Sequence, residues 1–413
     1  MSESILELLI GASALCLIIM ALVLFVLTAR KLLLLSGTAR LIINDSAPIS
    51  VALGQKLLLA LTESGVNFPA ACGGKGICGL CQINVTKGNS PLLPIESTHI
   101  SSVQAAQGFR LACMLRIKGD LSVQVPEKYF SKNIQQCKVI TNRLVSAYMT
   151  ELTIEPIDNV DFTFEAGDYV LLTAPPCTIE WQQFAIPPSY LSEWEKFGLL
   201  NLEVKIEENE LRAYSLSNAP SESNKIQLLV RIATPPANAP FGTTAGKVSS
   251  YIFSLKPGDI VSITGPFGSF HCRENDREML FIGGGAGMAP LRAMIREQLL
   301  WKKSTRNISF WYGARNKQQL CYQTEFEQLA QSFANFNWHV ALSESLEEDG
   351  WHGYAGFIHT VLLQEYLANH PAPQNIDYYV CGPPVMSSAV ITMLLGLGVG
   401  ADSIFNDDFV RGG

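Results

Sequence analysis

The stretch ACGGKGICGLC, Ala71–Cys81, places three thiols, Cys72, Cys78 and Cys81, in C-x5-C-x2-C spacing. The glycines between them let the backbone wrap closely and turn amide N–H groups inward. A fourth cysteine, Cys113, follows in RLACMLRI. A [2Fe–2S] cluster is held by four thiolates, and hydrogen bonds to its sulfurs help to set the reduction potential. We therefore predict that these four cysteines hold such a cluster and that the chain carries single electrons.

A structural zinc site is the alternative interpretation, because zinc also binds four cysteines. Zinc ribbons usually show two C-x2-C pairs. Here Cys113 stands alone in its segment, and the spacing therefore favours the iron–sulfur cluster.

The cysteine run and its surroundings resemble the ferredoxin family, although the first interval is one residue longer than in the plant-type spacing. The resemblance implies a β-grasp domain with the cluster in a surface loop, and we place this domain at residues 36–130. Local patterns agree with it. Ala39–Ile43 and Leu121–Val125 predict strands, and Lys56–Ser64 predicts a helix bounded by glycines.

Composition sets the outer limits. With 413 residues and a net charge of −7, the chain is too long for one core and we expect about three folded units. The acidic balance does not favour nucleic acid as a partner. The chain has ten cysteines, and those outside the cluster set show no pairing pattern. We therefore expect a reducing compartment and no disulfide framework.

The N-terminus holds a second strong signal. Leu8–Leu27 carries no charge and is long enough to span the hydrocarbon core of a bilayer. Arg30 and Lys31 follow it, the reverse of the order in a cleaved signal peptide, and they place the rest of the chain in the cytoplasm. We predict a single transmembrane anchor over residues 5–28, with a buried globular helix as the alternative. One uncharged helix forms no ion pathway.

Strand-like runs punctuated by Pro and Gly follow the first domain and predict an antiparallel β-barrel over residues 131–272. Its segment RAYSLSN, Arg212–Asn218, offers a cation for a pyrophosphate, a ring to stack on a flavin and a hydroxyl for the flavin's reactive edge. Taken alone, it is equally typical of a strand with alternating faces. Farther on, GKVSSY, Gly246–Tyr251, places hydroxyls after a glycine at a helix start, which suits a phosphate.

From Glu278 onward strands alternate with helical stretches, which predicts a parallel doubly wound sheet over residues 273–413. MLFIGGGAGMAPLRAMI, Met279–Ile295, reads as a strand, a glycine loop and a helix with Pro290 in its first turn. Pro290 takes the place of the third glycine of the full dinucleotide fingerprint. YYVCGPP, Tyr378–Pro384, ends another strand, and open α/β sheets bind ligands at such ends.

The elements R-x-Y-S, G-x-x-S, G-x-G-x-x-P and C-G-P-P occur in the order of the ferredoxin–NADP reductase superfamily, which residues 135–413 resemble. The resemblance implies a flavin barrel followed by a nicotinamide domain. It assigns FAD to Arg212, Tyr214, Ser215, Gly246, Ser249 and Ser250. It assigns the nicotinamide nucleotide to Gly283, Gly285, Gly287, Cys381 and Gly382. The predicted cofactor-binding set also includes Asn218, Arg231 and Ala233.

The order of anchor, ferredoxin, FAD and nicotinamide units resembles the family of F subunits in the bacterial sodium-translocating NADH:quinone oxidoreductases. VRIATPP, FIGGGAGMAP, FWYGAR, GYAGFIH and CGPP carry this resemblance. We therefore expect a multidomain α+β and α/β protein. It comprises an N-terminal transmembrane helix, a β-grasp [2Fe–2S] ferredoxin domain, an antiparallel flavin-binding β-barrel and a doubly wound nucleotide-binding domain.

The resemblance implies the NADH-oxidising entry subunit of that sodium-transporting enzyme, with a [2Fe–2S] cluster, FAD and NADH as cofactors. A hydride from NADH is split into single electrons, which leave for membrane partner subunits and finally quinone. Ser215 is implied to polarise flavin N5, Cys381 to line the nicotinamide pocket, and Phe409 to hold the place of the nicotinamide. The chain is implied to be a single-pass protein of the bacterial inner membrane with cytoplasmic domains, and sodium transport belongs to the partners. Arg315 could pair with a 2′-phosphate, but the resemblance favours NADH.

Some features depart from the family pattern or leave alternatives open. The flavin-phosphate loop reads TTAGKVSSY, with Lys247 in a segment where we expect a proline pair and a glutamine, and the tail DDFVRGG extends beyond Phe409. The insertion Cys177–Leu211, which carries two tryptophans, is either a functional loop or a surface excursion capped by its own aromatics. A membrane-tethered reductase component of a multicomponent oxygenase is the alternative function, and a redox sensor without turnover is a third.

Overall fold

The computed structural model describes two compact units. Residues 1–66 and 81–130 belong to the first unit, and residues 67–80 and 131–413 belong to the second. The residues described are 11, 13, 15–23, 25, 37–66, 68, 74, 76, 79–88, 91–125, 134–157, 161–222, 225–235, 245–345 and 350–408.

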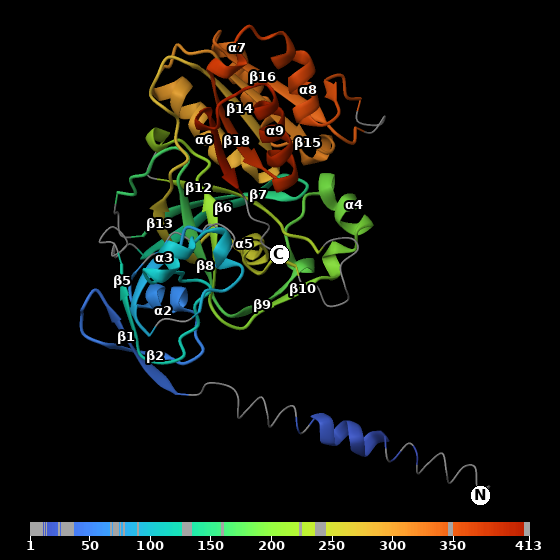
Figure 1. Cartoon of the computed structure of the whole chain (residues 1–413). Helices are drawn as coiled ribbons and strands as arrows, with labels where there is room; N and C mark the ends of the chain where they lie inside the picture. Colours follow the sequence, from blue (N-terminus) through green and yellow to red (C-terminus); the bar gives the residue numbers. More distant parts are fainter. Residues whose placement is uncertain are drawn as a thin grey trace, which may run out of the picture. The chain divides into compact units, whose positions relative to one another are not determined.

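The first unit is built on a mixed five-stranded sheet of order β2-β1-β5-β3-β4, of which β1, β2 and β5 are labelled in Figure 1. β1 runs parallel to β5, and the other neighbours are antiparallel. The strands are β1 (Thr38–Ile43), β2 (Ile49–Ala52), β3 (Gln82–Lys87), β4 (Phe109–Leu111) and β5 (Leu121–Gln124). The α-helices described here are α2 (Leu57–Glu63) and α3 (Ser102–Ala106). The two strands and the helix predicted from the sequence are confirmed.

Side-chain periodicity explains this sheet and its helix. Along β1, Ala39, Leu41 and Ile43 are buried while their neighbours are more exposed, the period of two expected of a strand with one face in a core. On α2 the buried residues include Leu57 and Leu61, one helical turn apart. The first unit therefore has its own hydrophobic core.

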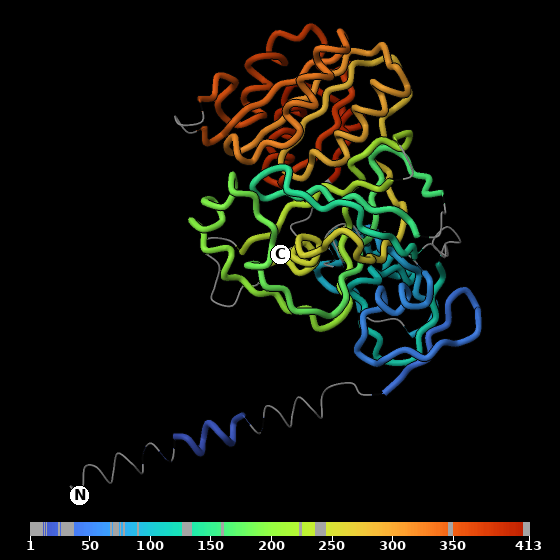
Figure 2. Tube along the Cα trace, turned by 180° about the vertical axis from the view of Figure 1, so that it is seen from behind, coloured from blue at the N-terminus to red at the C-terminus, as the bar shows by residue number. Residues whose placement is uncertain are grey.

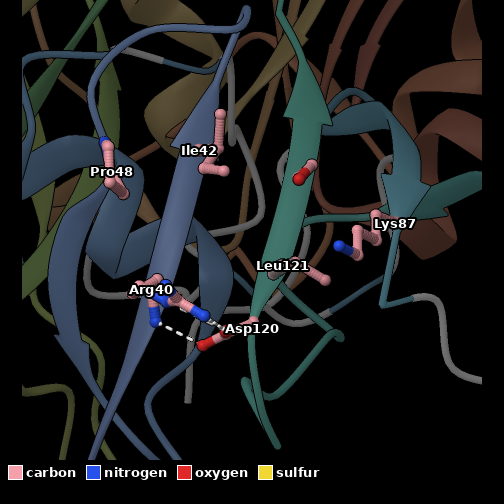
Figure 3. A pocket seen from close by; sticks show the side chains of 7 residues that line it. Arg40, Ile42, Pro48, Lys87, Asp120 and Leu121 are labelled. Carbon is pink, nitrogen blue, oxygen red and sulfur yellow. Dashed lines mark hydrogen bonds and ion pairs between the residues drawn. The ribbon is translucent and has the colours of Figure 1, made fainter.

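A shallow hollow of about 180 Å³ lies beside the β1–β5 pair. Arg40 on β1 donates to the Asp120 carboxylate from its backbone N–H at 2.9 Å and from its guanidinium at 2.6 and 3.0 Å (Figure 3). The residues that line the hollow include Lys87 but none of the predicted site residues.

The second unit begins with a six-stranded antiparallel sheet of order β11-β8-β13-β6-β7-β12. A backbone bridge between Leu216, which follows β11, and Leu228 of β12 joins the two edges, so the sheet closes as a barrel. Its strands are β6 (Ile134–Ser146), β7 (Met149–Pro156), β8 (Tyr169–Ala174), β11 (Glu210–Ser215), β12 (Ile226–Arg231) and β13 (Ile260–Phe267). Helix α5 (Lys247–Ser254) packs against β8 and β11.

The insertion between β8 and β11 forms its own small substructure. It contains the antiparallel pair β9 (Cys177–Glu180) and β10 (Glu203–Ile206), a short turn η3 (Trp181–Gln183) and helix α4 (Pro188–Lys196). η3, β9 and β10 all contact α5, and the insertion accordingly lies beside that helix in Figure 2.

The rest of the second unit is a six-stranded parallel sheet of order β17-β16-β15-β14-β18-β19. The predicted parallel doubly wound sheet is confirmed. The strands are β14 (Glu278–Gly284), β15 (Ile308–Ala314), β16 (Phe336–Leu342), β17 (Tyr354–Ala355), β18 (Ile376–Gly382) and β19 (Ile404–Asp408). The helices are α6 (Met288–Arg296), α7 (Gln323–Ser332), α8 (Ile358–Glu365) and α9 (Pro384–Gly396).

Helices cover both faces of this sheet. Phe281 and Phe310 belong to the same buried cluster as residues of α6 and α7, whereas Leu280 and Ile282 share a cluster with α8 and α9. Successive residues of β14 therefore point to opposite covered faces, which explains its uninterrupted apolar run. The chain leaves the sheet centre in one direction through β15 and β16 and then returns to β18 on the other side. Strand order thus reverses between β14 and β18, where doubly wound folds bind nucleotides.

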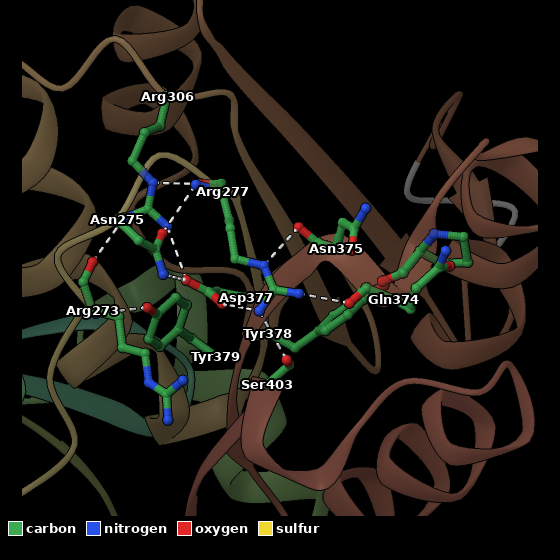
Figure 4. Close-up of polar contacts among 11 residues, drawn as sticks. Arg273, Asn275, Arg277, Arg306, Gln374, Asn375, Asp377, Tyr378, Tyr379 and Ser403 are labelled. Atoms are coloured by element: carbon green, nitrogen blue, oxygen red, sulfur yellow. Dashed lines mark hydrogen bonds and ion pairs between the residues drawn. The ribbon is translucent and has the colours of Figure 1, made fainter.

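A buried carboxylate secures the start of β18 (Figure 4). Asp377 is fully buried and accepts hydrogen bonds from Arg306 at 3.1 Å, Asn275 at 2.8 Å and Arg277 at 3.4 Å. Arg277 also donates to Ser403 at 3.0 Å. These contacts tie the segment that enters the nucleotide sheet to β18 and to the turn before β19, away from the strand ends that would bind a ligand.

Part of the predicted N-terminal anchor, residues 5–28, lies outside the described residues. Among the residues that are described, no helix is both long and apolar enough to cross a membrane.

Candidate functional site

Strand β11 arranges the first group of predicted flavin residues. Side chains alternate along a strand, so Glu210, Arg212 and Tyr214 share one face of β11 and Ser215 lies on the other. Ser215 is buried. Burial raises the pKa of the Tyr214 phenol well above its usual value, so this ring stays neutral and can offer a flat uncharged surface.

Ala233, Gly246 and Ser249 lie together where β12 ends and α5 begins. The Gly246 N–H donates to Ala233 O at 2.8 Å, and the Ala233 N–H donates to Ser249 Oγ at 3.2 Å. A Cβ on Gly246 would lie 2.6 Å from the Ala233 Cβ and 2.7 Å from Ser249 Oγ, so only glycine fits. The residues just after β12 and the start of α5 are therefore in direct contact, and this junction of Ala233, Gly246 and Ser249 is called the turn at Gly246.

This turn has more hydrogen-bond donors than it can use. The Gly246 carbonyl oxygen accepts from the Ser250 N–H at 3.0 Å, the Ser250 hydroxyl at 2.7 Å and the Ser249 hydroxyl at 3.1 Å. A carbonyl oxygen has two lone pairs, so one of the three donors is in excess and can turn to a ligand oxygen. The residues present therefore fit an acceptor-rich group such as a phosphate.

Three charged groups stand beside the same turn. Lys247 Nζ donates to Glu210 Oε1 at 2.7 Å, and Arg212 lies 3.7 Å from Glu210 Oε2. Two cations thus share one carboxylate, and the local balance is positive at the start of α5. Sequence reasoning left Lys247 open and missed Glu210, although its two-residue spacing from Arg212 on a strand was a usable signal.

Asn218 and Arg231 occupy different surroundings. The Asn218 amide donates to Lys225 O at 2.8 Å and accepts from the Gln227 N–H at 2.9 Å, so both ends of the side chain close the turn before β12. Arg231 ends β12 with its guanidinium carbon 5.6 Å from the Tyr148 ring centroid. Neither contact joins them to the turn at Gly246.

The insertion contributes buried aromatics to the barrel itself. Trp181 and Trp194 are fully buried within the barrel core. The Trp181 indole N–H donates to Ser250 Oγ at 3.0 Å, and the Trp194 indole N–H donates to Ala147 O at 2.7 Å. The two rings pack on each other, with centroids 5.7 Å apart, as a segment capped by its own aromatics would have them. Trp194 also packs on Phe253 of α5, so the insertion is part of the barrel core and not a separate surface excursion.

The nucleotide side of the site lies at the reversal point of the parallel sheet. A Cβ on Gly287 would lie 1.9 Å from Cys381 O, and one on Gly382 would lie 3.1 Å from Gly284 N. The glycine loop after β14 and the end of β18 therefore touch backbone to backbone, and a larger residue at Gly287 cannot fit. Gly283, Gly287, Cys381 and Gly382 are brought together as the motif order predicts.

A buried hydroxyl that sequence reasoning missed holds the loop. The Tyr312 OH at the end of β15 donates to Gly285 O at 3.0 Å. It also lies 3.7 Å from Cys321 Sγ. Burial raises the pKa of the Cys321 thiol to about 12, so this cysteine is a neutral structural neighbour of the loop.

Arg292 connects the nucleotide helix to the barrel, and sequence reasoning missed it too. Its side chain is buried and donates to both carboxylate oxygens of Glu325 at 3.0 Å, to Ser217 O at 2.7 Å and to Gln227 Oε1 at 3.2 Å. Its guanidinium also lies over the Tyr322 ring, 4.5 Å from the centroid. Ser217 belongs to RAYSLSN and Gln227 to β12. One side chain of α6 therefore joins the parallel-sheet part of the site to its barrel part. The signal was an arginine within the apolar run PLRAMI.

Two of the four predicted cluster ligands are described. Cys81 and Cys113 are buried, and the Ala112 N–H donates to Cys81 O at 2.9 Å. β3 and β4 thus bring the two cysteines to neighbouring backbone positions. Cys72 and Cys78 lie outside the described residues, as does Phe409. Within the described part of the chain no group of three or more His, Cys, Asp or Glu side chains is placed to hold a metal.

Comparison with known proteins gives three domain matches. They are described as "2Fe-2S iron-sulfur cluster binding domain" over residues 41–118, "Oxidoreductase FAD-binding domain" over 196–272 and "Oxidoreductase NAD-binding domain" over 281–391. The predicted cofactors, a [2Fe–2S] cluster, FAD and NADH, are confirmed at the level of these domains.

Similarity to curated proteins extends over nearly the whole chain. The F subunit of the Na(+)-translocating NADH-quinone reductase of Neisseria gonorrhoeae is 44% identical over 403 residues, 98% of this chain and 99% of the relative. The F subunit of Actinobacillus pleuropneumoniae is 46% identical, over 97% and 98% of the two chains. That of Haemophilus influenzae is 45% identical, over 99% and 100%. The chain belongs to this family of F subunits.

Two solved structures share the fold of this chain. A cytochrome P450 reductase from Amycolatopsis matches with a TM-score of 0.60 and 23% identity, over 91% of this chain and 100% of its own. A ferredoxin reductase in carbazole 1,9a-dioxygenase matches with a TM-score of 0.59 and 23% identity, over 91% and 99%. At these identities the likeness concerns the fold alone.

Proposed function

We propose that this chain is the NADH-oxidising entry subunit of a sodium-translocating NADH:quinone reductase. The observation that carries the proposal is kinship with the F subunits over essentially the full length of both chains, with three cofactor domains in one polypeptide. When bound, FAD takes up a hydride and releases single electrons, and a [2Fe–2S] cluster accepts one electron at a time.

The barrel residues would bind and orient FAD. Arg212 and the surplus donors of the turn at Gly246 would hold the pyrophosphate, because they supply positive charge and unfilled hydrogen-bond capacity. Tyr214 offers a neutral ring for stacking. Ser215, on the opposite face of β11, would direct its hydroxyl toward the flavin's reactive edge.

The nucleotide residues would bind NADH at the reversal point between β14 and β18. Gly285, with nothing within 4 Å of the position that a Cβ would take, would let the dinucleotide approach the backbone, while Gly283 and Gly287 would keep the loop close to Leu291 and Cys381. Cys381 and Gly382 would line the nicotinamide pocket. Arg315 has the Glu344 carboxylate 4.0 Å from its Nε. An acidic group there opposes a 2′-phosphate and suits a 2′-hydroxyl, which supports NADH over NADPH. Phe409 would hold the place of the nicotinamide until NADH displaces it.

Cys72, Cys78, Cys81 and Cys113 would hold the cluster as thiolates. Electrons would leave it for membrane-embedded partner subunits and finally for quinone. The apolar stretch within residues 5–28 would anchor the chain as a single-pass protein in the bacterial inner membrane, with its domains in the cytoplasm. Sodium transport would belong to the partner subunits, because one uncharged helix offers no ion path.

The test is NADH:quinone reduction in native membranes, with and without sodium, in cells with and without this chain. We expect a sodium-stimulated activity that deletion abolishes and that the chain restores when it is supplied again. A Cys81→Ser chain should restore NADH oxidation by an artificial dye and not quinone reduction. Unchanged sodium-stimulated activity after deletion would contradict the proposal and favour a reductase that serves an oxygenase.

A further inference from the structure

A charged group, Lys247, begins α5 beside the proposed flavin-phosphate turn. Lys247 stands before the paired serines, in a segment where the family resemblance leads us to expect a glutamine. Its Nζ lies 2.7 Å from Glu210 Oε1, and Arg212 lies 3.7 Å from the other carboxylate oxygen. The inference rests on the proposed function and concerns how this chain retains FAD.

We propose that Lys247 is an additional cation for the FAD pyrophosphate, and that Glu210 is an internal counter-ion that this pyrophosphate displaces. Glu210 and Arg212 lie on the same face of β11, and α5 packs against that strand. Lys247 directly follows Gly246, whose carbonyl has the surplus donors. The cation and the phosphate-binding turn are thus parts of one structure.

Charge explains why an exchange is favoured. Two cations and one carboxylate leave the group with a net charge of +1, whereas a pyrophosphate brings at least two negative charges. Glu210 and a bound pyrophosphate would repel each other while competing for the same ammonium. The three side chains are 21 to 36% exposed, so each contact is of moderate strength and can be broken without uncovering a deeply buried charge.

The insertion provides this counter-ion and braces the same helix. Glu210 lies within the segment Cys177–Leu211, and Trp181 of that segment donates to Ser250 on α5. Both serine hydroxyls accept one hydrogen bond and donate one to Gly246 O. The two bonds of Ser249, at 3.2 and 3.1 Å, are longer than those of Ser250, at 3.0 and 2.7 Å, so Ser249 is the donor that is easier to release. The insertion would therefore tune both the charge and the hydrogen bonding of the flavin-phosphate turn.

The experiment measures flavin binding to the full-length chain, purified in detergent and stripped of FAD. Lys247→Gln keeps a polar side chain and removes the charge. We expect it to raise the Kd for FAD and for FMN by about 2- to 5-fold and to leave the Kd for riboflavin, which has no phosphate, unchanged. Glu210→Gln should lower the Kd for FAD. Inorganic pyrophosphate should compete less well for Lys247→Gln than for the wild type.

Salt separates a charge effect from a packing effect. At about 1 M salt the Debye length falls to about 3 Å, so the difference in the Kd for FAD between the wild type and Lys247→Gln should become smaller. Equal FAD binding by both chains would overturn the proposal, as would an equal loss of FAD and riboflavin binding, or weaker FAD binding by Glu210→Gln. A wild-type chain that binds no FAD would instead contradict the proposed function.

Discussion

Replacement of Arg292 by Met is the sharpest test of how the two halves of the second unit cooperate. Met keeps the length of the apolar stem and deletes the guanidinium. Ser217 O, in the buried interface, and Gln227 Oε1 then lose this donor. Glu325 retains Arg296, which donates to it at 2.6 Å. A buried acceptor left without a donor costs about 1–3 kcal/mol, and the combined loss should be about 3 kcal/mol, a large share of the ~5–15 kcal/mol typical of a domain.

The same change should slow hydride transfer. Arg292 lies on α6 behind the nucleotide loop and bonds to the barrel segments that carry flavin residues, so its loss would let the two halves shift. A misplacement of about 1 Å can cost about 10²-fold in rate. We expect flavin reduction by NADH, measured in a single turnover by stopped-flow absorbance, to fall about 10- to 100-fold. Arg292→Lys keeps the positive charge but has fewer hydrogen-bond donors. Its rate of flavin reduction should lie between those of the wild type and Arg292→Met.

Arg306→Met is the matched control. It removes an equally buried guanidinium from Asp377, and the hydrogen bonds described for Arg306 stay inside the nucleotide part. Thermal unfolding followed by circular dichroism should show a comparable loss of stability for both variants. Only Arg292→Met should slow flavin reduction. Equal rates in the two variants, at equal loss of stability, would refute the positioning role of Arg292.

Three further predictions concern buried polar contacts. A hydrogen bond to Asp168 raises the pKa of His271 above its usual 6.5. The pair therefore stabilises the fold fully below about pH 6.5 and loses this stabilisation as the pH rises through the folded-state pKa. The difference between the urea midpoints of the wild type and His271→Gln should become smaller across that pH range. Asp377→Ala removes the carboxylate that pairs with the buried Arg306 and should cost about 3–5 kcal/mol in urea unfolding, whereas a loss below about 1 kcal/mol would contradict this. Trp181→Phe removes the N–H that holds Ser250 and should lower Tm by about 2–4 °C while weakening FAD binding, which Trp194→Phe should leave intact.

Much of the site could be predicted because its backbone demands particular residues. Gly287 must be glycine where it meets the end of β18, and Gly246 must be glycine where it meets Ala233. Because such backbone contacts require particular residues, they produce short recognisable motifs in the sequence. The order of these motifs indicates the barrel and the parallel sheet in which they lie. The alternation of strands with helical runs likewise predicted the parallel sheet, since strands covered on both faces are apolar throughout.

The contacts that sequence reasoning missed have no fixed spacing. Arg292 meets Ser217, 75 residues away, and Trp181 meets Ser250 across 69 residues. Lys247 and Glu210 are 37 residues apart, and only the packing of α5 on β11 makes them a pair. Side-chain partnerships between elements depend on packing geometry, and a single sequence records only hints such as a charge within an apolar run.

The buried aromatics of the barrel and of the parallel sheet have an optical consequence. All six tryptophans, from Trp181 to Trp351, belong to the second unit. Ultraviolet emission from indole therefore reports on that unit alone. Oxidised flavin absorbs where indole emits, so bound FAD would quench the tryptophan fluorescence by resonance energy transfer. The quenching would be strongest for the two tryptophans of the insertion beside α5. The first unit has no tryptophan and adds no indole emission. A cluster held by Cys72, Cys78, Cys81 and Cys113 would be followed by its visible absorption. One unlabelled sample thus offers two separate signals, and loss of either cofactor can be followed without disturbing the other.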